Sequence, residues 1–242
     1  MKFFPPHDWL GKEIVFPDDI GVTWVLSEKL SEDSRQLTQK DCAEFNASSI
    51  AWAVFSCHRK DGMGGKHAMK IYMQVPWTDT EFASAASRKA QADINRSDSM
   101  ASEIKALRLL TENGSTHTPL LISDFHTTQD NDGIVPTGFI SYILMTWCPG
   151  VTLGDGDYRR KTKSEQARIF QAFREALEDT KRCGVVSNGL GPGNLIWDAA
   201  HNTCYMVDFK WSGPPSEWDI AEEVWMSWGL QPGPPRLEME RL

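Results

Sequence analysis

The stretch over 184–211 reads G-V-V-S-N-G-L-G-P-G-N-L-I-W-D-A-A-H-N-T-C-Y-M-V-D-F-K-W, and its pattern predicts a β-hairpin. A loop rich in glycine, asparagine and proline leads into an apolar run over 195–197, and a polar turn precedes a second apolar run over 203–207. Two strands joined in this way present Asn194 and Asp208 together. An amide oxygen and a carboxylate are hard ligands, suited to a magnesium ion that carries phosphates. From this stretch alone, a turn residue and a strand-end cap are equally good interpretations of these two residues.

The same stretch resembles the catalytic loop and metal loop of the protein kinase-like superfamily, in which H-R-D-L-x-x-x-N is followed by D-F-G. The corresponding residues are S-N-G-L-G-P-G-N over 187–194 and D-F-K over 208–210. The resemblance implies that Asn194 and Asp208 are metal ligands. It also places Gly189 at the family's catalytic aspartate, which accepts or orients the proton of the attacking hydroxyl. A glycine has no group for that task, so the catalytic residue is unknown.

Upstream, the order of elements resembles the small lobe of a kinase. The pattern predicts strands over 50–57 and 67–75 joined by a glycine-rich turn. The second strand contains A-M-K-I, which is similar to the family's V-A-I-K strand. The resemblance implies that Lys70 holds nucleotide phosphates and forms an ion pair with a helix glutamate, for which Glu103 is the candidate. A solvent-facing strand lysine and a solvated helix glutamate are the alternatives.

The strand predicted over 138–147 ends in C-P-G, as the family's hinge segment does. The resemblance implies that backbone groups of this segment face an adenine, which makes Met145 and Trp147 candidates for nucleotide binding. A buried edge strand that ends in a turn would have the same sequence pattern. Lys210 is a further candidate for the nucleotide site, and its ammonium could neutralise the carboxylate of Asp208.

The other elements are predicted from hydrophobic periodicity and from turn and capping residues. We expect an irregular arm over 1–21, a strand over 24–30, a loop or short helix over 31–46, a helical region over 80–113 that is interrupted at 95–99, a strand over 119–127, a helix over 164–183 and a Trp-rich helix over 216–228. Thr80 and Ser164 are the expected N-caps of the two longer helices, and Gly114 is the expected stop of the first.

Composition excludes several classes of protein. The net charge of -8 argues against a nucleic-acid surface, because such surfaces neutralise phosphates with a basic face. The 5 cysteines are scattered without C-x-x-C spacing, which gives no disulfide framework or zinc site and favours a reducing, cytoplasmic setting. The N-terminus lacks the apolar run of a signal peptide, and no stretch reaches the roughly 18 apolar residues of a membrane span. We therefore expect neither a nucleic acid nor a membrane as a partner.

Together, these features predict an α+β, protein kinase-like two-lobe fold with a truncated C-terminal lobe. The N-terminal arm and a small β-rich lobe with a helix would occupy 1–147, and a short helical lobe with degenerate catalytic and metal loops would occupy 148–242. The resemblance covers roughly two thirds of the chain, from Ile50 to Phe209. It departs from the family in the glycine-rich loop, the histidine and aspartate of the catalytic loop, and the last glycine of D-F-G. The chain is similar to the divergent, compact kinase-like proteins found in fungi.

Three functions fit this resemblance, and the sequence leaves open whether any reaction is catalysed. The first is a pseudokinase-like binding protein with weak or no binding of ATP and magnesium, which the missing base favours and which a protein partner would suit. The second is a small-molecule phosphotransferase that uses another base such as Asp198, a residue that also fits a plain turn. The third is a repurposed enzyme whose apolar inter-lobe cleft performs non-phosphoryl chemistry on a small molecule such as a secondary metabolite.

Overall fold

The structure is a computed structural model that describes residues 2–18, 21–95, 97–154, 157–216 and 228–230. The chain divides into two compact units, the first made of Met1–Ile104 and Leu121–Trp147 and the second of Lys105–Leu120 and Cys148–Leu242. Helix α4 (Asp98–Glu112) begins in the first unit and ends in the second. Most of the Trp-rich helix predicted over 216–228 lies outside the described residues.

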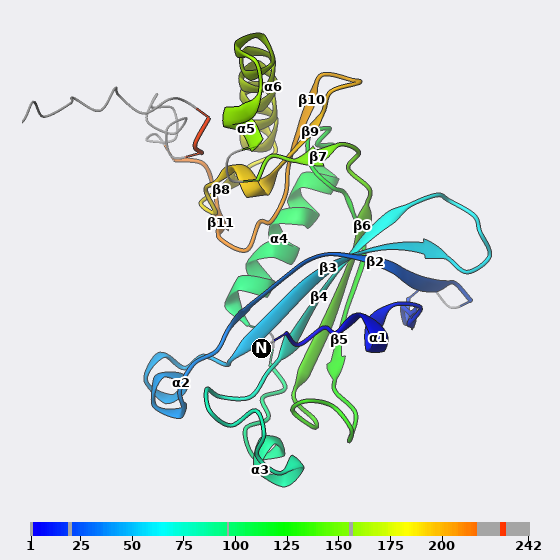
Figure 1. Ribbon diagram of the computed structural model, residues 1–242, viewed down its shortest axis with the longest axis vertical. Helices are drawn as coiled ribbons and strands as arrows, with labels where there is room; N and C mark the ends of the chain where they lie inside the picture. The colour runs from blue at the N-terminus through cyan, green and yellow to red at the C-terminus, as the bar shows by residue number, and fades with distance from the viewer. Residues whose placement is uncertain (1, 19–20, 96, 155–156, 217–227, 231–242) are drawn as a thin grey trace, which may run out of the picture. The chain divides into compact units, whose positions relative to one another are not determined.

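The first unit is built on a six-stranded antiparallel sheet with the strand order β1-β2-β3-β4-β6-β5 (Figure 1). The strands are β1 (Glu13–Val15), β2 (Thr23–Arg35), β3 (Ile50–Arg59), β4 (His67–Gln74), β5 (Leu121–Thr128) and β6 (Phe139–Thr146). The predicted hairpin of β3 and β4 is confirmed, and Val54 lies opposite Lys70. Strand β2 is much longer than the predicted strand over 24–30, because two register shifts against β3 break the alternation of its side chains.

The two faces of β4 differ, because successive side chains of a strand point to opposite faces of the sheet. Met69, Ile71 and Met73 belong to a buried apolar core on one face. Lys70 and Tyr72 lie at the alternate positions, and both contact Glu103 of α4. One face of the sheet thus carries an apolar core and the other carries a buried charge cluster.

The first 21 residues are not the irregular arm that we predicted. They contain α1 (Pro6–Trp9) and β1, and they bury aromatic rings in the core on the Met69 face of the sheet. The buried residues of this segment are Phe3, Phe4, Trp9, Ile14 and Phe16. Their spacing follows the surface that they cover rather than a helical or strand period, so periodicity alone could not reveal their burial.

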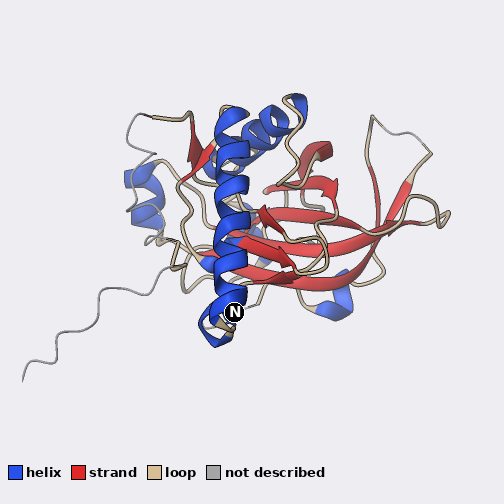
Figure 2. Ribbon diagram, turned by 90° about the horizontal axis from the view of Figure 1, so that it is seen from above, coloured by secondary structure: helices blue, strands red, loops and turns tan. Residues whose placement is uncertain are grey.

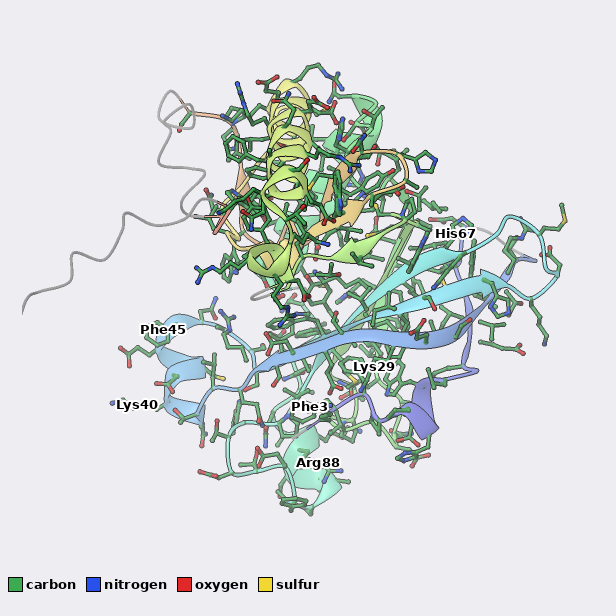
Figure 3. The ribbon with its side chains drawn as sticks, turned by 45° about the horizontal axis from the view of Figure 1, so that its top comes forward. Phe3, Lys29, Lys40, Phe45, His67 and Arg88 are labelled. Carbon is green, nitrogen blue, oxygen red and sulfur yellow. The ribbon has the colours of Figure 1, made fainter. Side chains whose placement is uncertain are left out.

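A charge cluster fixes the start of this N-terminal segment to β2 (Figure 3). The carboxylate of Glu32 accepts hydrogen bonds from the backbone N–H groups of Phe3, at 2.6 Å, and Phe4, at 3.1 Å. The ammonium of Lys29 lies 2.5 Å from Glu32 and donates to the carbonyl of Phe4. Burial opposes ionisation of Glu32, but the hydrogen bonds from Lys29 and the two N–H groups outweigh it and lower the pKa of this carboxyl.

Helix α2 (Gln39–Phe45) lies in the stretch over 31–46, where a loop or short helix is predicted. Helices α3 (Ala85–Lys89) and α4 lie in the helical region predicted over 80–113. The prediction that Thr80 is an N-cap was wrong. Ser84 caps α3 by accepting a hydrogen bond from the N–H of Ser87, while Thr80 belongs to a preceding turn. The predicted break and the predicted stop are confirmed, since α4 begins only at Asp98 and Gly114 follows its end with a φ of +64°.

The second unit combines helices with small sheets (Figure 2). Its remaining elements are β7 (Val151–Thr152), α5 (Asp157–Arg160), α6 (Lys163–Arg182), β8 (Val186–Ser187), η1 (Pro192–Asn194), β9 (Leu195–Asp198), β10 (Thr203–Met206) and β11 (Ser212–Gly213). The predicted hairpin is confirmed, because β9 and β10 are antiparallel neighbours. The N-cap of α6 is Thr162 and not Ser164, since the Thr162 hydroxyl accepts from the N–H of Glu165.

The predicted order of elements is therefore present, and the fold is α+β with the order of elements that the kinase-like resemblance implied. Five predicted strands and a helix precede the C-P-G segment, and a long helix then leads into the β9–β10 hairpin. Among the helices of the described residues, none is both long enough and apolar enough to cross a lipid bilayer.

Candidate functional site

Lys70 and Glu103 form the ion pair that the resemblance implied. The ammonium of Lys70 lies 2.8 Å from Oε1 and 2.7 Å from Oε2 of Glu103, so both carboxylate oxygens are engaged. The two side chains are only 3% and 2% exposed, which makes this a buried pair rather than the surface contact of the alternative interpretation. Removing one partner of such a pair leaves the other charge buried and is strongly destabilising.

Tyr72 is a member of this cluster that the sequence analysis missed. Its hydroxyl donates a hydrogen bond to Oε2 of Glu103, and its ring lies 5.1 Å from the ammonium of Lys70. The signal was present in the sequence, because residues two apart on a strand share a face. A lysine followed two positions later by a tyrosine thus presents an ammonium and a hydroxyl to the same helix.

The hinge candidates lie at the end of β6. Met145 is buried and lies opposite Ala68 of β4, while Trp147 is half-buried just beyond the strand. The ammonium of Lys66 lies over the indole ring of Trp147, 3.9 Å from its centroid. Such a cation–π contact stabilises the ring against the β3–β4 loop. Whether these groups bind an adenine stays a prediction.

The connection between β2 and β3, over 36–49, lies one hairpin before the β3–β4 turn that leads into the strand of Lys70. It contains no glycine and holds helix α2, which a capping box between Thr38 and Asp41 fixes at its start. A glycine-rich loop covers phosphates with backbone N–H groups that approach them closely. Helix α2 stands in this connection instead of such a loop. This part of the chain departs from the family pattern as the sequence suggested.

In the second unit, the residues of the predicted catalytic loop lie together. The side-chain amide of Asn194 donates to the carbonyl oxygen of Gly189 at 2.8 Å, and the N–H of Val207 donates to the carbonyl of Asn194 at 2.9 Å. These bonds tie the loop before β9 to the end of β10. A Cβ atom built on Gly189 would lie 3.5 Å from Nδ2 of Asn194 and 3.5 Å from the carbonyl oxygen of Asp208. Position 189 therefore has room for a Cβ atom, and the sequence supplies none.

Asp208 has an unusual backbone and a cationic neighbour. Its φ is +66°, in the left-handed region that costs a side-chain-bearing residue energy and that is concentrated at functional sites. The ammonium of Lys210 lies 3.2 Å from Oδ2 of Asp208. Phe209, between them, is fully buried and anchors the segment. The backbone turn thus presents the carboxylate and the ammonium on the same side of Phe209.

The donor set near Asp208 fits magnesium in chemical type. Because the amide nitrogen of Asn194 is bonded to Gly189, its carbonyl oxygen is left to act as a ligand, and Asp208 supplies a carboxylate. Lys210 competes with a cation for that carboxylate. No cluster of three or more His, Cys, Asp or Glu side chains with metal-binding geometry occurs among the described residues. We therefore expect weak binding of magnesium unless a phosphate group supplies further oxygens.

Asp198, the base considered for the phosphotransferase alternative, has a structural role in the β9–β10 turn. Its Oδ1 accepts hydrogen bonds from the N–H groups of Ala200 and His201, and its Oδ2 lies 2.7 Å from Nδ1 of His201. The bond from His201 and the two N–H groups lower the pKa of this carboxyl. A carboxylate that is fixed in this way and less basic than usual is poorly suited to accept a proton from a substrate hydroxyl.

Comparison with known proteins does not place the chain in a family. No protein family model matches the sequence, and no curated protein matches it either. Among solved structures, the chain is similar to the kinase PK-1 of the Cydia pomonella granulovirus, with a TM-score of 0.45 and 16% identity over 79% of this chain and 52% of that chain. The chain thus spans about half the length of that kinase. The role of each residue here rests on the geometry of this chain.

Proposed function

We propose that this protein is a divergent kinase-fold binding protein that takes a nucleotide or a related phosphorylated small molecule and does not transfer its phosphate efficiently. The observation that carries the proposal is Gly189. The loop around it is held by Asn194 and has space for a Cβ atom, yet the position of the family base has no side chain. Phosphoryl transfer to a hydroxyl then lacks the group that would accept or orient its proton.

The binding half of the proposal is supported by the first unit. Keeping Lys70 and Glu103 buried and charged is expensive unless the pair has a role, because an apolar pair of similar volume is often as stable or more stable. In the kinase-like resemblance, this lysine is the group that contacts phosphates. Lys210 and the glycine-free β2–β3 connection both argue for weak binding of magnesium and ATP.

A small-molecule phosphotransferase is the second candidate. It is favoured by the preservation of Asn194 and Asp208, which lie on backbone segments joined by the hydrogen bond between Val207 and Asn194. Since much of phosphoryl transfer is positioning and charge stabilisation, a slow reaction without a dedicated base is chemically feasible. Chemistry on an apolar compound in a cleft stays a prediction from the sequence, with no specific contact that favours it.

A thermal-shift titration tests the proposal. The purified protein is melted with ATP, with magnesium chloride and with both, beside an Asp208→Ala variant and a Glu178→Gln control on the exposed face of α6. Because a ligand that binds only the folded state raises the melting midpoint by mass action, we expect a modest rise with ATP. Magnesium should increase that rise only in chains that keep Asp208. No shift with ATP at millimolar concentration would refute nucleotide binding.

A further inference from the structure

The chain contains two Asn–Gly dipeptides, Asn113–Gly114 and Asn188–Gly189. Asparagine is a thermally labile residue, and it is most labile before glycine, because no Cβ atom then hinders attack of the following backbone nitrogen on the side-chain amide. Both asparagines are exposed, so exposure does not distinguish them. The two dipeptides differ instead in the hydrogen bonds that hold the atoms that would react.

Asn113 and Gly114 are fixed at the end of α4. Nδ2 of Asn113 donates a hydrogen bond to the carbonyl oxygen of Leu109 at 2.9 Å, and the N–H of Gly114 donates to the carbonyl oxygen of Thr111 at 3.1 Å. The guanidinium of Arg182 donates to the carbonyl oxygens of both residues, at 3.1 Å for Asn113 and 3.3 Å for Gly114. The side-chain amide and the nitrogen that would attack it are therefore both held in other bonds.

Asn188 and Gly189 lie in the loop that follows β8 (Figure 1). The backbone N–H of Asn188 donates to the carbonyl oxygen of Trp211 at 2.6 Å, which fixes the start of the loop. The side-chain amide of Asn188 has no hydrogen-bond partner within the described part of the chain. The N–H of Gly189 donates to Oγ of Ser187 at 3.3 Å, which is long for a hydrogen bond. The side chain of Asn188 is therefore free to turn toward the nitrogen of Gly189.

We propose that Asn188 deamidates spontaneously in the folded chain. The backbone nitrogen of Gly189 loses its proton to hydroxide and attacks Cγ of Asn188, which forms the N–Cγ bond of a cyclic succinimide. The bond from Cγ to Nδ2 breaks, and Nδ2 leaves as ammonia after taking a proton from water. Water then opens the succinimide. In sum, the amide and one water become a carboxylic acid and ammonia, with no oxidation or reduction.

Water opens the ring at either of its carbonyl groups, so two products form. Cleavage of the N–Cγ bond gives aspartate at position 188. Cleavage of the bond between the nitrogen and the main-chain carbonyl carbon of residue 188 gives isoaspartate. Both products add a negative charge to the loop, and isoaspartate also makes the main chain one atom longer, because the chain then runs through Cβ and Cγ.

The longer main chain affects the hydrogen bonds on either side of the modified residue. The N–H of Asn188 is bonded to Trp211, and the carbonyl oxygen of Gly189 accepts from Nδ2 of Asn194 at 2.8 Å. An extra main-chain atom between these two groups changes their spacing, so isoaspartate strains or breaks at least one of the bonds. The modification lies in the loop of the proposed function, but its chemistry requires neither a nucleotide nor a metal.

Peptide mass spectrometry on the full chain tests the proposal. The folded protein is incubated in mildly alkaline buffer, which favours loss of the Gly189 proton. Trypsin, which cleaves after Arg108 and Arg182, then places the two dipeptides in separate peptides. We expect Asn188 to deamidate about tenfold faster than Asn113, since two hydrogen bonds must break at Asn113 before attack. The control is the chain unfolded in urea, in which the two rates should be similar.

A variant tests the route of the reaction. Gly189→Ala puts a Cβ atom on the attacking residue, and that atom meets only ordinary contacts, so the variant should fold and deamidate several-fold more slowly at Asn188. A protein isoaspartyl methyltransferase should label incubated wild type more strongly than the variant. The proposal is overturned if Asn188 stays intact in the folded chain while the unfolded chain converts, if Asn113 converts as fast as Asn188 in the folded chain, or if Gly189→Ala converts at the wild-type rate.

Discussion

The cluster around Lys70 and the loop around Gly189 differ in how their polar side chains are buried and hydrogen-bonded. Lys70, Glu103 and Tyr72 are buried and joined by hydrogen bonds that engage both oxygens of the carboxylate. In the loop, Asn194 and Asp208 are half-buried, position 189 has no side chain, and Lys210 lies beside the carboxylate. Under the proposed function, the first cluster would hold a phosphate, while the loop would lack the group that accepts the proton during its transfer.

The proposed function therefore separates two kinds of residue, those that support the fold and those that would serve only the reaction. The Lys70–Glu103 pair is part of the packing of the first unit, so losing one partner would damage the fold. A base at position 189 would not be needed for the fold, because the loop there is held by backbone groups and by Asn194.

The largest expected change in the free energy of unfolding comes from breaking the buried Lys70–Glu103 pair. Lys70→Ala should lower the free energy of unfolding by about 3–5 kcal/mol, because it leaves the Glu103 carboxylate buried without compensation. The combined change Lys70→Met with Glu103→Leu should recover part of the loss, because it removes both charges but also the acceptor of the Tyr72 hydroxyl. Lys60→Ala is the control in the same unit, since Lys60 and Glu13 form an exposed pair worth less than about 1 kcal/mol. Urea unfolding measures all of them, and equal losses in Lys70→Ala and Lys60→Ala would contradict the account.

Two glycines of the second unit should respond differently to alanine. A Cβ on Gly150 would lie 2.4 Å from the carbonyl oxygen of Trp197, and its φ is +119°, so Gly150→Ala should cost about 2–4 kcal/mol. Gly189→Ala should be neutral or stabilising by up to about 1 kcal/mol, because the new atom meets only ordinary contacts. The comparison is made by urea unfolding. A large loss from Gly189→Ala would mean that glycine is there for the backbone and not because a base has been lost.

The charge cluster that fixes the N-terminal segment to β2 should make a smaller, pH-dependent contribution to the free energy of unfolding. Glu32→Gln should cost about 1–2 kcal/mol at pH 7, because a neutral amide accepts weaker hydrogen bonds from Phe3, Phe4 and Lys29. The pKa of Glu32 in the folded protein is below its usual 4.5. Its contribution is therefore complete above that value and is lost as the pH falls through the lower, folded pKa. Wild type and variant should become equally stable in acid, and a constant difference from pH 7 to acid would argue against this role.

The smallest expected effect concerns magnesium. Lys210→Gly should tighten binding of magnesium about fivefold, because it removes an ammonium 3.2 Å from the Asp208 carboxylate at a partly exposed site. Lys210→Arg keeps the positive charge and serves as the control. Calorimetric titration with magnesium chloride in the presence of ATP measures the change. Equal affinities for wild type and Lys210→Gly would show that the lysine does not compete for Asp208.

The sequence predicted the parts of the fold that local patterns determine. The β3–β4 and β9–β10 hairpins have apolar runs joined by turn residues, and the end of α4 has a glycine in the conformation that ends helices. The capping residues were wrong by two to four positions, Ser84 for Thr80 and Thr162 for Ser164, because neighbouring Ser and Thr residues offer the same hydrogen bond. Which of these residues is the N-cap depends on where the helix begins in the folded chain.

The parts that the sequence could not predict depend on tertiary contact. The burial of Phe3, Phe4 and Trp9 follows from the curl of the sheet, which no local pattern records. Gln129 begins the polar stretch Q-D-N-D-G over 129–133, yet it is buried, and its side chain forms hydrogen bonds with the backbone of Gln74 and Val135. The ion pair of Lys70 was foreseen through the kinase-like resemblance, whereas Tyr72 was missed because that resemblance did not include it.

The central claim is that this chain holds a nucleotide but lacks the base for transfer. Its most direct test is the release of labelled phosphate from ATP and magnesium under single-turnover conditions, with wild type and a Gly189→Asp variant in parallel. The account predicts no release above the uncatalysed rate from wild type and a measurable rate from Gly189→Asp, whose Cβ atom would meet only ordinary contacts. Release by wild type that Gly189→Asp does not increase would contradict it, because catalysis would then come from another group.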